Sequence, residues 1–276
     1  KEVNYAMATI RLVLTALLSI GVAALIPATP AQQTQLAIRS LKNAIQKESN
    51  KPHRLYVDYL IPLPPETVAA DIDPWPGGLA QMYPYAEDII KEILGKVVDE
   101  PASECSSQVI FPQDCCGFFV QESNTSPKND IAAILFPGVD QLDKISEIDN
   151  MVGDRTLIIF NRQFKRCEDF GFGKKDKSNT IIFDRFKWGF AFQEFACRGE
   201  DVKLTYDFPN WKSCAICDED EDLGAREIDL LPNQMDRPLY EDLEKKINEV
   251  LPEPLWMRKM GEVEVKGFKF QRGEGD

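Results

Sequence analysis

Cys214 and Cys217 form a CxxC pattern, the spacing found in redox-active and zinc-binding sites. A redox pair needs a helix N-terminus to stabilise its thiolate, whereas the segment from Trp211 to Cys217 has the composition of a strand. In a strand the two cysteines point to opposite faces. Zinc needs a second pair of ligands, and the sequence holds no second CxxC. We therefore expect neither redox nor metal chemistry here, and we predict that both thiols are dispensable.

The segment Gly171-Phe172-Gly173-Lys174-Lys175 has the glycines and lysines of a phosphate-binding loop. The Walker pattern requires Gly five residues before the Gly-Lys pair and Ser or Thr after it. Those two positions hold Glu168 and Lys175. The segment is therefore interpreted as a solvated basic loop.

Histidine occurs once, at His53, which argues against histidine-based metal sites and against a Ser-His-Asp hydrolase. Its place just before a predicted strand favours a surface or capped residue. Carboxylate pairs such as Asp71 with Asp73 and Glu227 with Asp229 arise by chance in an acidic chain. The sequence lacks GxSxG, HExxH and a GxGxxG that follows a strand. It predicts no catalytic, cofactor-binding or metal-binding residue.

The composition is that of a folded, acidic protein. The chain has 276 residues, with 32 Lys and Arg against 45 Asp and Glu, a net charge of -13. It is 43% hydrophobic and 28% charged, which excludes a disordered chain and allows a large core. An acidic balance argues against nucleic acid as the partner, because phosphate binding requires a basic face. Seven cysteines without regular spacing indicate free thiols in a reducing compartment.

An uncharged apolar run extends from Leu12 to Ile26, with Arg11 before it and Pro27 after it. As a helix it would span roughly 22 Å, less than the roughly 30 Å of a hydrocarbon core. The preferred interpretation is that this run is retained in the protein as a helix, which is buried in a core, at a membrane surface or against a partner. A signal peptide that starts at Met7 is the second interpretation, and a transmembrane span is the third.

Strands and helices alternate up to about residue 161, which predicts right-handed crossovers and a doubly wound parallel sheet. Ile131–Phe136 and Arg155–Phe160 are continuous apolar runs, typical of strands buried on both faces. The other predicted elements of this part are helices over Thr34–Lys47, Leu79–Val98 (interrupted near Pro84), Cys115–Glu122 and Asp140–Met151, and strands over Arg54–Leu63 and Ser107–Phe111.

The pattern then changes to closely spaced strands with short turns, which predicts an antiparallel extension. These strands are predicted over Thr180–Phe186, Phe190–Cys197, Val202–Phe208 and Trp211–Cys217, with Lys187-Trp188-Gly189 as one turn. An amphipathic helix is expected over Leu239–Val250, and Val263–Phe270 alternates like an edge strand or an ordered arm. The domain division is an apolar segment over 1–30, one α/β domain over 31–250 and a C-terminal arm over 251–276.

The loop from Arg162 to Lys177 holds six basic residues against three acidic ones, with phenylalanines between them. It follows a buried parallel strand, so it leaves the carboxyl edge of the sheet, where such folds present binding loops. A solvated loop is the more frequent outcome for a charge run. Aromatic and arginine residues in an acidic protein favour an interface. The predicted docking residues are Arg162, Lys165 and Arg166 for steering, Phe170 or Phe172 for anchoring, and Lys174 and Lys175.

Several short motifs along this order of elements resemble a family known from plastids and cyanobacteria. They are Ala31–Ala37 (AQQTQLA), Arg54–Leu63 (RLYVDYLIPL), Leu157–Asn161 (LIIFN), Phe190–Gly199, Trp211 and Arg237–Tyr240 (RPLY). The family is an uncharacterised Rossmann-like domain that is fused behind a chloroplast adenylate kinase and also found in low-photosystem-II-accumulation factors. The likeness covers residues 31 to 250. This chain differs in lacking a kinase domain and in its apolar N-terminus and C-terminal arm.

The resemblance implies a Rossmann-like α/β fold, a parallel sheet with helices on both faces. The residue patterns add the antiparallel C-terminal strands as an extension and the apolar N-terminal helix before it. The resemblance also implies a plastid (chloroplast) protein on the stromal side of the thylakoid membrane, tied to photosystem biogenesis or structure. The expected partners are photosystem core or antenna subunits, with Leu12 to Ile26 as a membrane contact. The family defines no functional residues, so none can be transferred.

Two functions from different classes follow. The first is a non-catalytic photosystem-associated protein, either a peripheral subunit, with photosystem I preferred, or an assembly factor. The alternative is a nucleotide- or sugar-phosphate-binding enzyme of the stroma. A phosphate site would need a Gly-rich turn after the first strand, and this chain has Pro62-Leu63-Pro64-Pro65 there. Because proline has no N–H to donate, we expect no tightly bound nucleotide or flavin.

Overall fold

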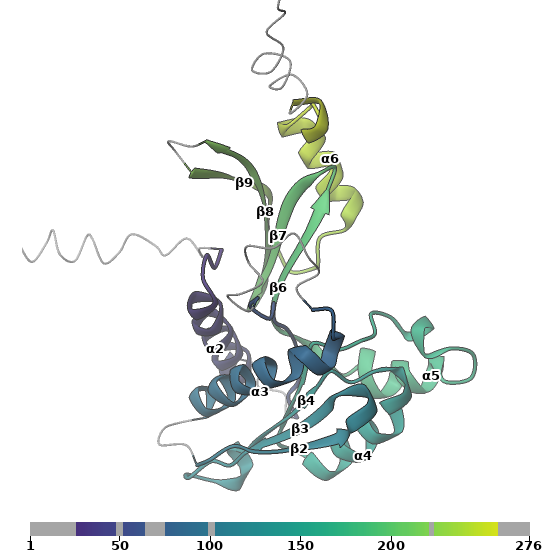
Figure 1. Ribbon diagram of the computed structural model, residues 1–276. Coiled ribbons are helices and arrows are strands. Elements are labelled where there is room, and N and C mark those ends of the chain that lie inside the picture. Colours follow the sequence, from purple (N-terminus) through teal and green to yellow (C-terminus); the bar gives the residue numbers. More distant parts are fainter. Residues whose placement is uncertain (1–25, 48–51, 64–74, 99–102, 221–223, 259–276) are drawn as a thin grey trace, which may run out of the picture.

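The computed structural model describes residues 26–47, 52–63, 75–98, 103–220 and 224–258 (Figure 1). The predictions for the apolar run up to residue 25, for Asp71 and Asp73, and for Val263–Phe270 lie outside the described residues.

A single mixed sheet of nine strands runs through the described part, in the order β2-β3-β4-β5-β1-β6-β7-β8-β9. Its centre is parallel: β4 pairs with β5, β5 with β1, and β1 with β6. On both sides of this centre the neighbouring strands are antiparallel. The strands are β1 (Arg54–Asp58), β2 (Ser106–Phe111), β3 (Cys116–Gln121), β4 (Ile131–Leu135), β5 (Thr156–Phe160), β6 (Lys187–Cys197), β7 (Glu200–Asp207), β8 (Asn210–Asp220) and β9 (Gly224–Gln234).

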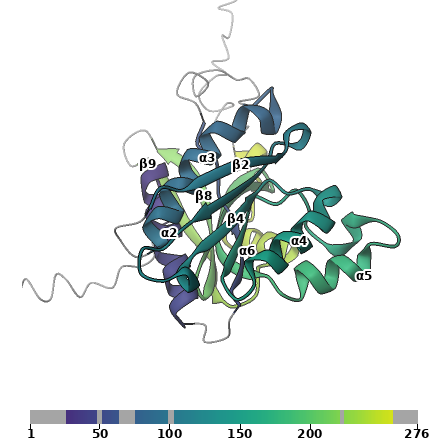
Figure 2. The ribbon, with the colours of Figure 1, turned by 90° about the horizontal axis from the view of Figure 1, so that it is seen from below.

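Helices cover both faces of the parallel centre (Figures 1 and 2). One face carries α2 (Pro30–Lys47) and α3 (Gly78–Val97), which pack on Leu55 and Val57 of β1. The other face carries α4 (Leu142–Val152), near Tyr56, and the short α5 (Lys175–Ser178). The last helix, α6 (Tyr240–Val250), packs on the antiparallel half, against β6 and β9.

The alternation of β1 decides which side chains enter which core. Leu55 and Val57 join the core under α2 and α3, whereas Tyr56 joins the core under α4. All residues of β4 and β5 are buried, as expected of central parallel strands with helices on both faces. Their continuous apolar sequences thus correspond to the centre of the fold.

Helix α2 lies unusually close to β6, because the position facing Leu41 is a glycine. A Cβ at Gly189 would come within 2.7 Å of Leu41 Cδ2. The Ser40 hydroxyl donates to the Gly189 carbonyl at 2.5 Å and accepts from the Phe208 amide at 2.8 Å. These contacts hold α2 against the junction of β1 and β6, where the strand pairing also shifts register.

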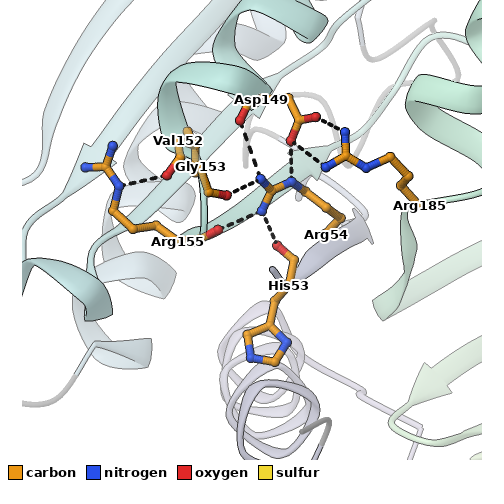
Figure 3. Close-up of polar contacts among 7 residues, drawn as sticks. All are labelled: His53, Arg54, Asp149, Val152, Gly153, Arg155 and Arg185. Atoms are coloured by element: carbon orange, nitrogen blue, oxygen red, sulfur yellow. Dashed lines mark hydrogen bonds and ion pairs between the residues drawn. The ribbon is translucent and has the colours of Figure 1, made fainter. Parts of the chain in front are cut away.

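A buried arginine network closes the amino edge of the parallel strands (Figure 3). The Arg54 side chain is 2% exposed and pairs with the equally buried Asp149 of α4. It also donates to the carbonyl oxygens of His53 at 3.0 Å, Arg155 at 2.7 Å and Gly153 at 2.6 Å. Because the last carbonyls of a helix have no partner within the helix, Arg54 satisfies the end of α4 and ties it to β1.

Two predicted elements have the wrong type. The short helix predicted over Cys115–Glu122 is strand β3, because Phe118, Phe119 and Val120 pair with strands on both sides. The strand predicted over Thr180–Phe186 is instead a helical turn of the π type over Asn179–Phe183. Ile182 and Phe186, four residues apart, are both buried in the core under α4, and that spacing suits a helix.

Other expectations also need correction. Lys187-Trp188-Gly189 begins β6 instead of forming a turn. The helix over residues 78–97 is not interrupted at Pro84, which is exposed and costs the helix one internal hydrogen bond. Strand β9 was not predicted. His53 is buried, 2% exposed, where a surface or capped residue was expected.

The fold class is thus α/β, with a large mixed sheet and helices. The part up to residue 161 differs from a doubly wound parallel sheet in that β2 and β3 are antiparallel. Among the described residues, no helix combines the length and apolar character needed to cross a bilayer.

Candidate binding cleft at the carboxyl edge of the sheet

A cleft of about 440 Å³ opens beyond the carboxyl end of β1. It forms there because β1 ends at Asp58, whereas the neighbouring β6 continues six residues past its last partner, Ala191. The loop that follows β5 and the segment that begins α6 line the other sides. The lining residues are Asp58, Arg162, Phe164, Lys165, Trp188, Gln193, Glu194, Phe195, Arg237, Pro238, Tyr240 and Leu243.

Asn161 directs the chain from β5 into the cleft. It has a positive φ of 48°, a conformation that Asn tolerates better than most residues. Its side chain accepts from the Tyr59 amide and donates to the Tyr59 carbonyl, both at 2.7 Å. These two bonds join the ends of β5 and β1, and so fix the position from which Arg162 projects.

The Arg162 guanidinium lies on two aromatic rings. Its Cζ is 4.0 Å from the centroid of the Tyr56 ring and 4.9 Å from that of Trp188. Such contacts orient a guanidinium but leave its N–H groups available at its edge. Arg162 forms no ion pair with any carboxylate that the structure describes.

A polar chain crosses the cleft from Arg237 to Asp58. Arg237 donates to Gln193 Oε1 at 2.9 Å, and Gln193 Nε2 donates to Asp58 Oδ2 at 2.5 Å. The amide of Gln193 thus links the cation at the mouth to the carboxylate at the end of β1. Arg237 also lies over the Trp211 ring, with its Cζ 5.9 Å from the centroid.

Burial raises the pKa of Asp58, because removal from water disfavours the carboxylate. The charge of Arg162, the bond from Gln193 and the charges of Arg237 and Lys165 act in the opposite direction without cancelling the effect. Burial also raises the pKa of Tyr56, whose ring lies against Arg162. Both groups are thus harder to ionise than they are in water.

The cations of the cleft differ from those of the adjoining loop. Within the described part of the chain, the side chains of Arg162, Lys165 and Arg237 form no ion pair. In the loop, Arg166 pairs with Asp169 at 3.4 Å, Lys175 with Glu168 at 2.8 Å, and Lys177 with Asp143. The cations of the cleft thus lack a direct ion pair among the described residues, whereas much of the charge of the loop is neutralised by ion pairs within it or with α4.

The structure divides the residues that were predicted to dock. Arg162 and Lys165 line the cleft, whereas Arg166, Lys174 and Lys175 are exposed outside it. Phe170 is 6% exposed and packs on Phe164, with ring centroids 4.8 Å apart, so it supports the loop from within and is not a surface anchor. Phe172 is fully exposed between Gly171 and Gly173, which both have positive φ.

Of the residues that line the cleft, sequence reasoning predicted Arg162 and Lys165 and missed the others, among them Asp58, Trp188, Gln193 and Arg237. Two of these stood out in the sequence, since Asp58 ends an apolar strand and Arg237 opens the RPLY motif. The sequence analysis assigned Trp188 to a turn. It assigned Gln193 to a strand but did not predict which strand pairs with it. Their convergence depends on β6 lying beside β1, which is a tertiary property.

The CxxC segment lies in β8, as predicted. Cys214 is fully buried, and burial raises the pKa of its thiol to about 12, with Glu227 acting in the same direction. The side chain of Cys217 lies outside the described residues. Six described cysteines are free thiols, and no cluster of three His, Cys, Asp or Glu side chains suited to a metal occurs among the described residues.

The structure is that of an α/β protein with a mixed nine-stranded sheet and a cation-lined cleft at its carboxyl edge. The chain belongs to the family described as a domain of unknown function, DUF1995, which matches residues 27–245. The match includes all nine strands and every residue that lines the cleft. No curated protein and no solved structure matches the sequence.

Proposed function

We propose that this protein is a non-catalytic photosystem-associated protein of the plastid that docks on the stromal face of the thylakoid. It acts as a peripheral subunit, with photosystem I preferred, or as an assembly factor. Membership of an uncharacterised domain family supports the resemblance on which this proposal draws. The photosystem partner itself comes from the resemblance and is open to test.

The observation that carries the proposal is a cationic edge on an acidic protein. The net charge is -13, yet three cations at the carboxyl edge have no ion-pair partner among the described residues. Lys174, exposed in the adjoining loop, likewise forms no ion pair in the described part of the chain. A positive patch on a negative body orients the protein toward an acidic surface as it approaches.

The tip of the loop supplies an apolar contact beside this charge. Phe172 is fully exposed and precedes Lys174 by two residues, so both lie at the tip. An aromatic side chain with few rotatable bonds is a typical anchor in an interface. Phe172 and Lys174 are therefore the contact residues of the docking surface, and the cations at the carboxyl edge steer the approach.

The test is binding to isolated thylakoid membranes and to solubilised photosystem complexes. Wild-type protein is expected to co-sediment with the membranes and to co-purify with one photosystem. The variant Phe172→Ser with Lys174→Glu should bind at least about tenfold more weakly, because it loses an anchor and reverses a steering charge. High salt should weaken wild-type binding, because the screening length falls to roughly 3 Å at 1 M.

A matched control makes the same changes at the opposite edge of the sheet. Lys128 and Met151 are exposed there, Lys128 just before β4 and Met151 near the end of α4. The variant Lys128→Glu with Met151→Ser should bind as wild type does. Equal binding of the two double variants would contradict the docking surface, and absence of wild-type binding would contradict the proposed function.

A further inference from the structure

The cleft contains features that steering toward an acidic surface does not explain. Its lining includes three cations, Arg162, Lys165 and Arg237, and two carboxylates, Asp58 and Glu194, which sum to a net charge of +1. A bound group with one negative charge would complement this lining.

Two arginines are available to hold such a group. Arg162 lies on the rings of Tyr56 and Trp188, which fixes its plane without engaging a carboxylate of the described residues. Arg237 uses one donor on Gln193, and its other N–H groups have no partner among the described residues. A guanidinium presents paired donors that match the two oxygens of a carboxylate.

Aromatic side chains form another part of the lining. Phe195 and Tyr240 lie with ring centroids 6.5 Å apart, and Trp188 lines the same cleft. A volume of about 440 Å³ is within the range of small-molecule sites, which combine apolar walls with a few polar groups. The cleft is thus suited to a small molecule with a planar apolar body and an anionic head.

We propose that the cleft binds a small organic carboxylate with a planar apolar body, with Arg162 and Arg237 holding the carboxylate and Trp188, Phe195 and Tyr240 contacting the body. This site is separate from the docking surface. Asp58 sets the selectivity: a phosphate ester brings a second negative charge toward this carboxylate, so it binds more weakly than a carboxylate on the same body.

The test compares four probes by titration calorimetry with the full chain: 2-naphthoate, 2-naphthyl phosphate, the neutral 2-naphthamide and acetate. We expect 2-naphthoate to bind at least about tenfold more tightly than 2-naphthamide, because the arginines recognise charge. Acetate, which lacks the apolar body, should bind more weakly than 2-naphthoate. The affinity for 2-naphthoate should fall as salt is added.

The variants Arg162→Met and Arg237→Gln should each lower the affinity for 2-naphthoate at least about tenfold. A second kind of variant is expected to bind one probe more tightly. A gain in affinity cannot result from misfolding of the site. Asp58→Asn should raise the affinity for 2-naphthyl phosphate several-fold, because it removes the repelling charge. The docking variant Phe172→Ser with Lys174→Glu should bind 2-naphthoate as wild type does.

Three results would overturn the proposal: no preference of wild type for 2-naphthoate over 2-naphthamide, unchanged affinity in both arginine variants, or no gain for the phosphate in Asp58→Asn. The proposed function is tested independently of the carboxylate site. Its readout is binding to thylakoid membranes, and its variant changes residues outside the cleft. Loss of thylakoid binding with intact 2-naphthoate binding would leave the carboxylate site in place.

Discussion

The two ends of strand β1 show two ways of using an arginine. At the amino end, Arg54 is buried and surrounded by acceptors, namely the Asp149 carboxylate and the carbonyls of His53, Gly153 and Arg155. At the carboxyl end, Arg162 lies on aromatic rings and has no carboxylate partner among the described residues. The first arrangement holds elements together, and the second leaves a charge available to something outside the chain.

The difference follows from how a buried charge is stabilised. A charge removed from water is tolerated when its hydrogen-bonding groups are satisfied, and Arg54 meets this requirement with groups from its own chain. Arg162 remains half-exposed and keeps part of its hydration, so it does not need such partners in the unbound protein. An arginine that is oriented by aromatic rings and has no carboxylate partner is therefore a better marker of a binding site than an arginine in an ion pair.

The largest expected effect comes from breaking the amino-edge network. Arg54→Met leaves the Asp149 carboxylate and several carbonyls without a buried donor, so it should lower the free energy of unfolding by about 3–5 kcal/mol. Urea denaturation followed by circular dichroism measures this loss. A loss below about 1 kcal/mol would mean that the network does not hold β1 to α4.

Arg185 binds the same carboxylate from its more exposed side, with 39% of its side chain accessible. Solvent screening reduces the value of such a pair, so Arg185→Met should cost only about 1 kcal/mol. The same denaturation experiment measures it, and the double variant with Arg54→Met tests whether the two arginines are coupled. A cost equal to that of Arg54→Met would show that exposure does not separate their roles.

At the carboxyl edge the corresponding substitution should have little effect on stability. Arg162→Met keeps an apolar stem on the rings of Tyr56 and Trp188 and loses a cation–π contact, so its cost should be below about 1 kcal/mol. The comparison with Arg54→Met is made under identical denaturation conditions. A cost near 3 kcal/mol would place Arg162 among the structural arginines and contradict the contrast between the two ends of β1.

The smallest expected effect is a gain. Burial raises the pKa of Asp58 above its ordinary value of 3.8, so the folded state holds this proton more tightly than the unfolded state. Its contribution to stability is therefore fully present below the ordinary pKa and is lost as the pH rises through the raised one. Asp58→Asn should stabilise the protein at pH 7 by less than about 1 kcal/mol, and the gain should vanish below about pH 4. Equal stability at pH 7 would indicate that Asp58 ionises without cost.

The residue patterns predicted the elements whose side chains repeat regularly or are buried on both faces. No tertiary information was needed for β4 and β5, because burial on both faces makes the whole strand apolar. The same holds for α2 and α6, because burial of one helix face gives a helical repeat of apolar residues. The residues of β3 and of the turn over Asn179–Phe183 were assigned wrongly, since short apolar segments fit both helix and strand. The contacts that such a segment makes with neighbouring elements decide whether it becomes a helix or a strand.

The sequence by itself determined an acidic α/β protein with a basic, aromatic loop after a buried strand, because charge and apolar periodicity are read directly from residue types. The tertiary structure alone decided which of those basic residues have partners. The pairing of β6 with β1 brings Trp188 and Gln193 beside Asp58, which lies more than 100 residues before them in the chain, and beside Arg162. Such long-range proximity cannot be read from local sequence, because it arises from hydrogen bonding between strands and from the packing of α6 on β6 and β9.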